Sequence, residues 1–252
     1  MNIAMTLSRF GMRPVLLTAI GQDAEGEELL SACAQLGMDV DHVYRSADLP
    51  TDRYMAVEGA NGLIAAIADA HSLEAAGAKI LDPLRGGALG GLDAPHEGIV
   101  ALDGNLTRAL LEEIATDPAF ARADLRIAPA SPGKAERLLP FLNHARGTLY
   151  VNLEEAGLLC QASFDSAPQA GAALIERGAA RALVTDGGNV TCDATPEGLL
   201  AERPPEVMVT RVTGAGDAFM AAHIASELRG APRELALHRA LATAAAYVAG
   251  GT

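Results

Sequence analysis

Residues 210–219 read Thr-Arg-Val-Thr-Gly-Ala-Gly-Asp-Ala-Phe and open a long apolar stretch that predicts a helix over 215–228. The first backbone N–H groups of a helix have no hydrogen-bond partner within the helix itself. Gly214 and Gly216 have no side chains, so the backbone here is uncovered and an anionic group can approach it closely. The stretch therefore predicts an anion-binding helix start.

Asp217 follows in the first turn of this helix, at the lip of the predicted anion site. A carboxylate repels a phosphate, so its presence suits a base that takes the proton from a hydroxyl attacking phosphorus. An ordinary helix start explains the same residues, with Thr213 as the N-cap and Asp217 complementing the helix dipole. Spacing alone leaves both interpretations open.

Composition excludes several classes of protein. The 252 residues suit one α/β domain or two small ones, and without an interdomain linker in the sequence we expect one domain over 1–252. A net charge of −13 argues against a nucleic-acid partner, whose phosphates require a basic face. The apolar runs are too short to span a membrane, and residues 1–4 do not resemble a signal peptide. The three cysteines read as reduced thiols without a zinc pattern, which predicts a cytoplasmic protein.

Strands and helices are expected to alternate along most of the chain. Apolar runs predict strands at 14–20, 98–102, 125–128, 148–151 and 182–185. Helices are expected at 2–10, 23–36, 215–228 and 233–248, with others starting near Thr107, Ser131, Glu154 and Ser166. This alternation predicts a mostly parallel sheet covered on both faces, with ligands at the carboxyl ends of the strands.

Two segments interrupt the alternation with an antiparallel character. Short strands are expected at 40–44, 53–58 and 63–68, and Asn61-Gly62 is a strong hairpin signal. We interpret the segment from about 40 to 70 as a small β lid. A second hairpin is expected within 189–209.

The common nucleotide-binding motifs are absent. Gly133-Lys134 lacks the following Ser or Thr and the earlier glycine of a Walker A loop, and no dinucleotide fingerprint follows a strand. There is also no Gly-x-Ser-x-Gly nucleophile elbow. A nucleotide must therefore bind through another loop.

Five segments together resemble the ribokinase-like (PfkB) carbohydrate and nucleoside kinases, in the order of that family. They are 212–219, Asp-Gly-Asn-Leu at 103–106, Ser-Pro-Gly-Lys at 131–134, Asn-Leu-Glu-Glu-Ala at 152–156 and Val-Thr-Asp-Gly at 184–187. The resemblance implies a three-layer α/β/α sandwich with a small β lid. Within the family, residues 51–69 are most similar to pseudouridine kinases.

The resemblance also implies roles for the residues of the first stretch. Asp217 would deprotonate the acceptor hydroxyl. The amides of Gly214, Ala215 and Gly216 would form the anion hole for the transferred phosphoryl group, an electrostatic contribution that usually dominates such catalysis. Thr213 would contact the nucleotide.

ATP and Mg²⁺ are the cofactors that the resemblance implies. Asn152 and Glu155 would hold Mg²⁺ through water, since this ion keeps much of its hydration shell. A helix N-cap at Asn152 explains the same residues. Thr185 and Gly187 would line the nucleotide groove together with Asn152, and an ordinary turn after a strand is the alternative.

On the acceptor side, the resemblance implies roles for residues from three segments. Asn2 and Asn105 would face the acceptor, and Thr51 and Arg53 would close over it from the lid. Lys134 is a candidate phosphate contact, and a solvated helix lysine explains it equally well.

The chain departs from the family pattern at several positions. Asn2 matches the last residue of a Gly-Gly-x-x-x-Asn box whose earlier part and preceding strand are missing, so we expect an N-terminal truncation, with a misassigned start or a degenerate protein as the alternatives. Arg211 stands where many members carry an Asp that helps bind a monovalent cation, so potassium activation is not expected. Ala128 and Val151 also replace family residues.

These inferences converge on an ATP-dependent kinase that phosphorylates a hydroxymethyl group of a ribosyl compound. Pseudouridine, giving its 5′-phosphate, is the leading acceptor. A kinase for ribose, fructose or a similar sugar is the alternative with the same chemistry, and a non-catalytic nucleotide-binding remnant is the alternative of another class. A homodimer formed through the lid is common in similar proteins.

Overall fold

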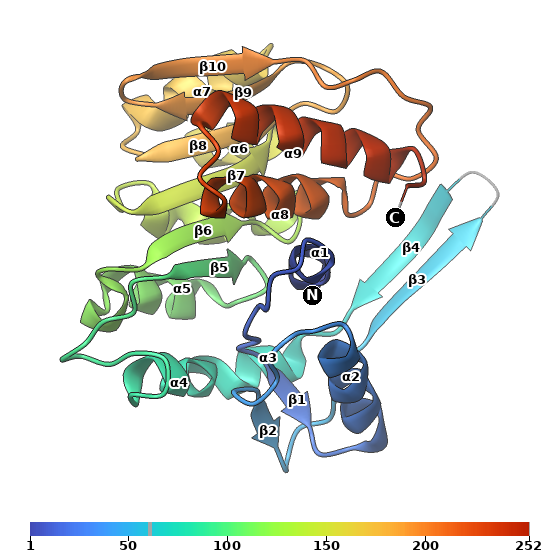
Figure 1. The fold of residues 1–252 in the computed structure, drawn as a ribbon, viewed down its shortest axis with the longest axis vertical. Coiled ribbons are helices and arrows are strands. Elements are labelled where there is room, and N and C mark those ends of the chain that lie inside the picture. Colours follow the sequence, from blue (N-terminus) through green and yellow to red (C-terminus); the bar gives the residue numbers. More distant parts are fainter. Residues whose placement is uncertain (60–61, 252) are drawn as a thin grey trace.

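The fold is organised around one large sheet, seen in a computed structural model that describes residues 1–59 and 62–251 (Figure 1). Within these residues the sheet has the strand order β10-β9-β8-β7-β6-β5. The bounds are Ile99–Asp103 (β5), Asp124–Ala128 (β6), Gly147–Asn152 (β7), Arg181–Thr185 (β8), Thr191–Thr195 (β9) and Gly198–Glu202 (β10). Strands β5 to β8 run parallel, whereas β9 and β10 are antiparallel to their neighbours. The carboxyl ends of β5 to β8 therefore meet along one edge.

Helices cover both faces of this sheet, as the sequence predicts (Figure 1). One face carries α5 (Arg108–Thr116), η3 (Pro132–Phe141), α6 (Leu153–Cys160) and α7 (Ala167–Glu176). The other face carries α1 (Asn2–Arg9), α8 (Ala215–Leu228) and α9 (Arg233–Val248). The arrangement is a three-layer α/β/α sandwich.

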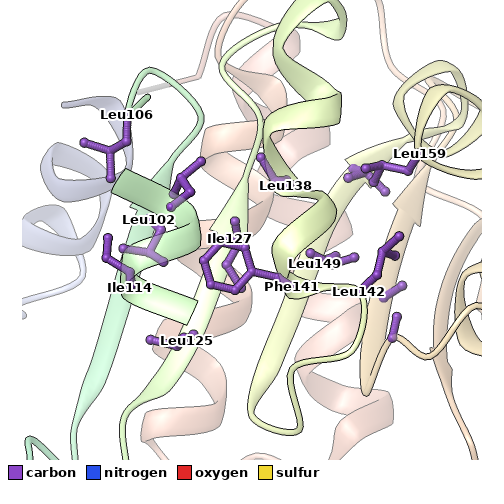
Figure 2. Packing of buried hydrophobic residues seen from close by; sticks show 14 of the residues in the cluster. Leu102, Leu106, Ile114, Leu125, Ile127, Leu138, Phe141, Leu142, Leu149 and Leu159 are labelled. Carbon is purple, nitrogen blue, oxygen red and sulfur yellow. The ribbon is translucent and has the colours of Figure 1, made fainter. Parts of the chain in front are cut away.

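Alternating side chains in the strands explain the two layers of packing. Leu149 and Val151 of β7 point into the core beneath α5, η3, α6 and α7, whereas Tyr150 between them packs against α8. Figure 2 shows the first of these cores, in which Phe141 of η3 lies among leucines and isoleucines from the strands. Burial of each such leucine contributes roughly 1.5–3 kcal/mol.

The segment between α1 and β5 forms a smaller unit. Strand β1 (Ala19–Gly21) pairs in parallel with β2 (Tyr44–Ser46), and α2 (Ala24–Gln35) lies between them in sequence. Short helices α3 (His71–Ala76), η1 (Gly77–Leu81) and α4 (Asp82–Arg85) then lead to the main sheet. The prediction of a strand over 14–20 is wrong for residues 14–18. Only residues 19 and 20 of that range belong to β1.

The lid is smaller than predicted. Strands β3 (Tyr54–Gly59) and β4 (Gly62–Ala68) form an antiparallel hairpin that pairs with no other strand among the described residues. It extends from the body of the protein (Figure 1). The third predicted lid strand, 40–44, is wrong, because the chain there leads into β2, which runs parallel to β1. Asn61 of the predicted turn lies outside the described residues.

Two further elements differ from prediction. The helix expected after Ser131 is the 3-10 helix η3, which contains Pro140, and Ser131 makes no capping hydrogen bond through its side chain. The second hairpin covers β9 and β10 and ends at Glu202, short of the predicted 209.

A 3-10 turn, η2 (Pro118–Phe120), follows α5. No helix in the described part of the chain has the length and apolar character needed to cross a membrane.

A buried charge network fastens α8 to the sheet. Glu227 of α8 accepts hydrogen bonds from Arg126 of β6 at 2.5 Å and from Arg181 of β8 at 2.6 Å. Arg181 also pairs with the fully buried carboxylate of Asp193 in β9. Such two-sided pairing compensates the charges for their loss of solvent. The network therefore fixes the far end of the helix whose first turn carries Asp217.

Candidate active site

Helix α8 begins without a side-chain cap. Its N-cap residue is Gly214, with φ of +92°, a conformation that glycine adopts without strain. The alternative interpretation, with Thr213 as the N-cap, is therefore wrong. The amides of Gly214, Gly216 and Asp217 have no hydrogen-bond partner among the described residues, and the space beside Gly216 is open.

The predicted anion hole needs one correction. The amide of Ala215 donates to the carbonyl of Val212 at 3.1 Å, so a turn occupies it. The free donors are instead the amides of Gly214, Gly216 and Asp217. Three N–H groups without a hydrogen-bond partner at the positive end of a helix dipole remain suited to an anion such as a phosphoryl group.

Asp217 stands half-buried beside these amides, where α1 meets α8. Its Oδ2 accepts a hydrogen bond from Nδ2 of Asn2 at 2.8 Å. Burial raises the pKa of the Asp217 carboxyl, the Asn2 hydrogen bond lowers it, and the nearby Asp103 carboxylate raises it. A carboxylate with a raised pKa is a better proton acceptor than an ordinary aspartate.

The loop after β5 brings polar groups to the same edge of the sheet. The backbone amide of Asn105 donates to Asp103 at 2.7 Å. Lys134, from the start of η3, donates to Oδ1 of Asn105 at 2.6 Å, so the interpretation of Lys134 as merely a solvated helix lysine is wrong. Arg137 donates to the Asn105 carbonyl at 3.1 Å and so holds the loop in place.

Asp103 was not predicted to have a role in the site. The negative charge of Asp103 lies close enough to Asp217 to raise the pKa of the Asp217 carboxyl. The signal in the sequence was its position directly after the apolar run of β5, at the carboxyl end of a parallel strand.

Asn152 and Glu155 form a capping box at the start of α6. Oδ1 of Asn152 accepts from the Glu155 amide, and Oε2 of Glu155 accepts from the Asn152 amide, both at 2.8 Å. The helix-cap interpretation is therefore confirmed. Burial raises the pKa of Glu155, which is only 7 % exposed.

The capping box still leaves one carboxylate oxygen for a water-mediated contact with magnesium. Oε1 of Glu155 and Nδ2 of Asn152 have no hydrogen-bond partner among the described residues, so one carboxylate oxygen is available. One or two carboxylate contacts, with water and phosphate completing the shell, suit Mg²⁺. No group of three or more His, Cys, Asp or Glu side chains that could hold a metal occurs in the described ranges. The magnesium role of the pair stays a prediction.

The predicted nucleotide residues lie along neighbouring strand ends. Asn152 at the end of β7 is opposite Thr185 at the end of β8. Gly187 follows in an exposed turn with φ of +54°, which favours glycine. Thr213 is exposed before α8, and its carbonyl accepts from the hydroxyl of Tyr247 at 3.0 Å.

The two predicted lid residues have structural contacts instead. Thr51 is 7 % exposed, and its hydroxyl donates to Asp23, the N-cap of α2, at 2.5 Å while accepting from the Gly21 amide. Its hydroxyl is therefore committed to anchoring α2, and its predicted contact with the acceptor is not supported. Arg53 forms an exposed ion pair with Glu25 of α2 at 2.6 Å, a kind of contact that contributes little stability.

Comparison with known proteins defines the class to which this fold and site belong. The family model described as pfkB family carbohydrate kinase matches residues 1–251. The chain belongs to this family of ribokinase-like carbohydrate kinases.

Individual relatives agree with this assignment. The chain is 31 % identical over 242 residues to the uncharacterized sugar kinase YeiI of Escherichia coli (strain K12), covering 91 % of this chain. It spans 62 % of the length of that relative. The structure is similar to a carbohydrate kinase from Agrobacterium tumefaciens, with 26 % identity, a TM-score of 0.78 and coverage of 97 % of this chain and 76 % of the other.

A third similarity concerns the fold alone. The ribokinase of Arabidopsis thaliana, whose structure was determined with ribose and ATP, is 20 % identical to this chain. The TM-score is 0.78, and the match covers 98 % of this chain and 79 % of the ribokinase. The ribokinase-like architecture predicted from the sequence is thereby confirmed.

Proposed function

We propose that the protein transfers the γ-phosphate of ATP to a hydroxymethyl group of a ribosyl compound. The observation that carries this proposal is the start of α8, where three free amides adjoin the half-buried carboxylate of Asp217. A site built only to bind phosphate gains nothing from a carboxylate beside it. A site that must also remove a proton from the attacking hydroxyl requires one.

The reaction divides between the two parts of this site. Asp217 takes the proton of the acceptor hydroxyl as its oxygen forms a bond to the γ-phosphorus, while the bond from that phosphorus to the β-phosphate oxygen breaks and ADP leaves. The amides of Gly214, Gly216 and Asp217 donate to the phosphoryl oxygens, on which negative charge is spread. The hydrogen bond from Asn2 holds the Asp217 carboxylate in place before the acceptor arrives.

Asn152 and Glu155 are the proposed magnesium residues, acting through bound water. The ion would neutralise charge on the ATP phosphates. Thr185, Gly187 and Thr213 would line the nucleotide groove along the ends of β8 and the start of α8.

Pseudouridine is the acceptor that we propose first, on the similarity of residues 51–69 to pseudouridine kinases. Asn2 and Asn105 are the proposed acceptor contacts, because they stand at the carboxyl edge of the sheet near Asp217 and Asp103. A free sugar such as ribose or fructose has a hydroxymethyl group of the same chemistry and is the alternative.

ADP release measured with MgATP and a panel of pseudouridine, ribose and fructose tests this function. Turnover with pseudouridine at the highest kcat/KM supports the proposal, and preference for ribose or fructose supports the alternative acceptor. Binding of MgATP without turnover of any acceptor contradicts the proposed kinase and favours a nucleotide-binding remnant.

Two expectations from the sequence stay predictions. Light scattering tests the homodimer through the β3–β4 hairpin. The three cysteines are buried and unpaired within the described residues, which suits the reducing cytoplasm that we propose for this enzyme.

A further inference from the structure

The loop that leads into the anion site is attached to the end of α9. The backbone amide and the hydroxyl of Thr210 both donate to the carbonyl of Val248, at 2.8 and 3.0 Å. The last carbonyls of a helix have no partners within it and form the negative end of its dipole. Segment 210–214 therefore supplies donors to a helix end that needs them.

Arg211 supplies the strongest of these contacts. Its Nε donates to the carbonyl of Tyr247 at 2.8 Å, and its Nη2 donates to the carbonyl of Gly251 at 2.5 Å. The guanidinium also lies over the ring of Tyr247, with 3.8 Å between its central carbon and the ring centroid. A cation stacked on an aromatic ring and bonded to two carbonyls is held more firmly than an ordinary surface arginine.

Tyr247 links Arg211 to the anion site, because it also contacts the turn at the start of α8. Its hydroxyl donates to the carbonyl of Thr213 at 3.0 Å, one residue before Gly214. A Cβ at Gly214 would lie 2.5 Å from that hydroxyl oxygen, so the tyrosine packs directly against the turn. The orientation of the Gly214 and Gly216 amides therefore depends on where Tyr247 stands.

We propose that Arg211 and Tyr247 are positioning residues that hold the anion-binding turn of α8 against the carboxyl end of α9. The positive charge of Arg211 is bonded to the carbonyl of Tyr247 in α9 and to that of Gly251 just beyond it, and the guanidinium fixes the ring of Tyr247. The ring then fixes Thr213, and with it the amides that receive the phosphoryl group. This inference rests on the proposed phosphoryl transfer at Asp217 and adds two residues that act through the anion-binding turn.

The test compares Arg211→Ala, Arg211→Lys and Tyr247→Phe with the wild type, and Arg239→Ala, an exposed arginine on α9, is the matched control. A misplacement of about 1 Å can cost about 10²-fold in rate. We expect Arg211→Ala to lose kcat on that order with little change in the acceptor KM. We expect a smaller loss in Tyr247→Phe, which keeps the ring but lacks the hydroxyl.

Two readouts separate positioning from a general loss of structure. Guanidinium ion at millimolar concentration should restore much of the Arg211→Ala rate, because the site is exposed and the carbonyls remain. Arg211→Lys should retain an intermediate rate. Calorimetry should show that Arg211→Ala weakens binding of MgAMP-PNP, which carries a γ-phosphoryl group, more than binding of MgADP.

The calorimetric comparison keeps this inference separate from the proposed function, because it needs no acceptor. If wild type phosphorylates nothing in the panel, a selective loss of MgAMP-PNP affinity in Arg211→Ala still supports the positioning role. Equal losses for the two nucleotides, or an Arg211→Ala rate equal to that of Arg239→Ala, would overturn it. So would a loss of rate that guanidinium does not restore.

Discussion

His223 on α8 provides a sharp test of how the active-site helix is held. Its ring is fully buried, stacked on Phe219, and its Nδ1 lies 2.8 Å from the hydroxyl oxygen of Tyr150. Arg181 donates to Nε2 at 3.3 Å, so Nε2 carries no proton and the Nδ1 proton is donated to Tyr150. Burial lowers the pKa of His223 to about 4. The ring is therefore neutral at pH 7, and its approach to Glu227 at 3.7 Å is not an ion pair.

The lowered pKa makes the free energy of unfolding depend on pH. The unfolded chain protonates this histidine near its ordinary pKa of 6.5, whereas the folded protein does so only near pH 4. Each pKa unit corresponds to about 1.36 kcal/mol. The stability that His223 contributes is therefore complete above pH 6.5 and falls by about 3 kcal/mol as the pH drops from 6.5 to 4.

Urea unfolding of wild type and His223→Gln over pH 4–8 measures this effect. Glutamine cannot titrate, so the difference between the two unfolding free energies should shrink by about 3 kcal/mol between pH 7 and pH 4. His42→Gln, at a half-buried position where the side chain makes no hydrogen bond or ion pair among the described residues, is the control for loss of any imidazole. Parallel curves for wild type and His223→Gln would refute a neutral buried ring at this position.

Three further variants probe the active site. Asn2→Ala removes a hydrogen bond that lowers the pKa of Asp217, so the acid limb of the kcat/KM profile should move to higher pH; an unmoved limb would contradict this coupling. Gly214→Ala should cost about 1–2 kcal/mol of unfolding free energy from its positive φ, and the clash with Tyr247 should reduce turnover; a stable and fully active variant would contradict the described turn. Glu155→Gln should raise the Mg²⁺ concentration needed for half-maximal turnover severalfold, and an unchanged requirement would remove Glu155 from the metal site.

The elements that sequence reasoning located well are those with a strong local signal. Helices α8 and α9 have the predicted bounds, because an apolar run between glycine-rich and proline-containing segments defines each. Strands β5 to β8 are short apolar runs between helices, a pattern that is typical of buried parallel strands. Strand β2 was missed because its parallel pairing with β1 joins segments more than twenty residues apart.

In the site, too, features that depend on neighbouring residues were predicted, whereas contacts between distant segments were not. The glycines and the acid at 214–217 indicated a possible anion site, although their spacing alone left an ordinary helix start equally open. The acceptor contact that the family resemblance implied for Thr51 is not supported, because a residue in a turn gives no sign that its hydroxyl will meet Asp23, 28 residues earlier. Arg211 appeared only as a departure from a family pattern. Its contacts with Tyr247 depend on α9 returning beside α8, which no local pattern records.

The rate of Asp217→Asn with MgATP and the preferred acceptor tests most directly whether Asp217 is the catalytic base. Asparagine has nearly the same shape but cannot accept the proton, so turnover should fall about 10²–10⁴-fold. MgATP binding by calorimetry should persist, and Asp165→Asn, at an exposed acid, should turn over like wild type. An Asp217→Asn enzyme as fast as wild type would contradict the assignment of Asp217 as the base.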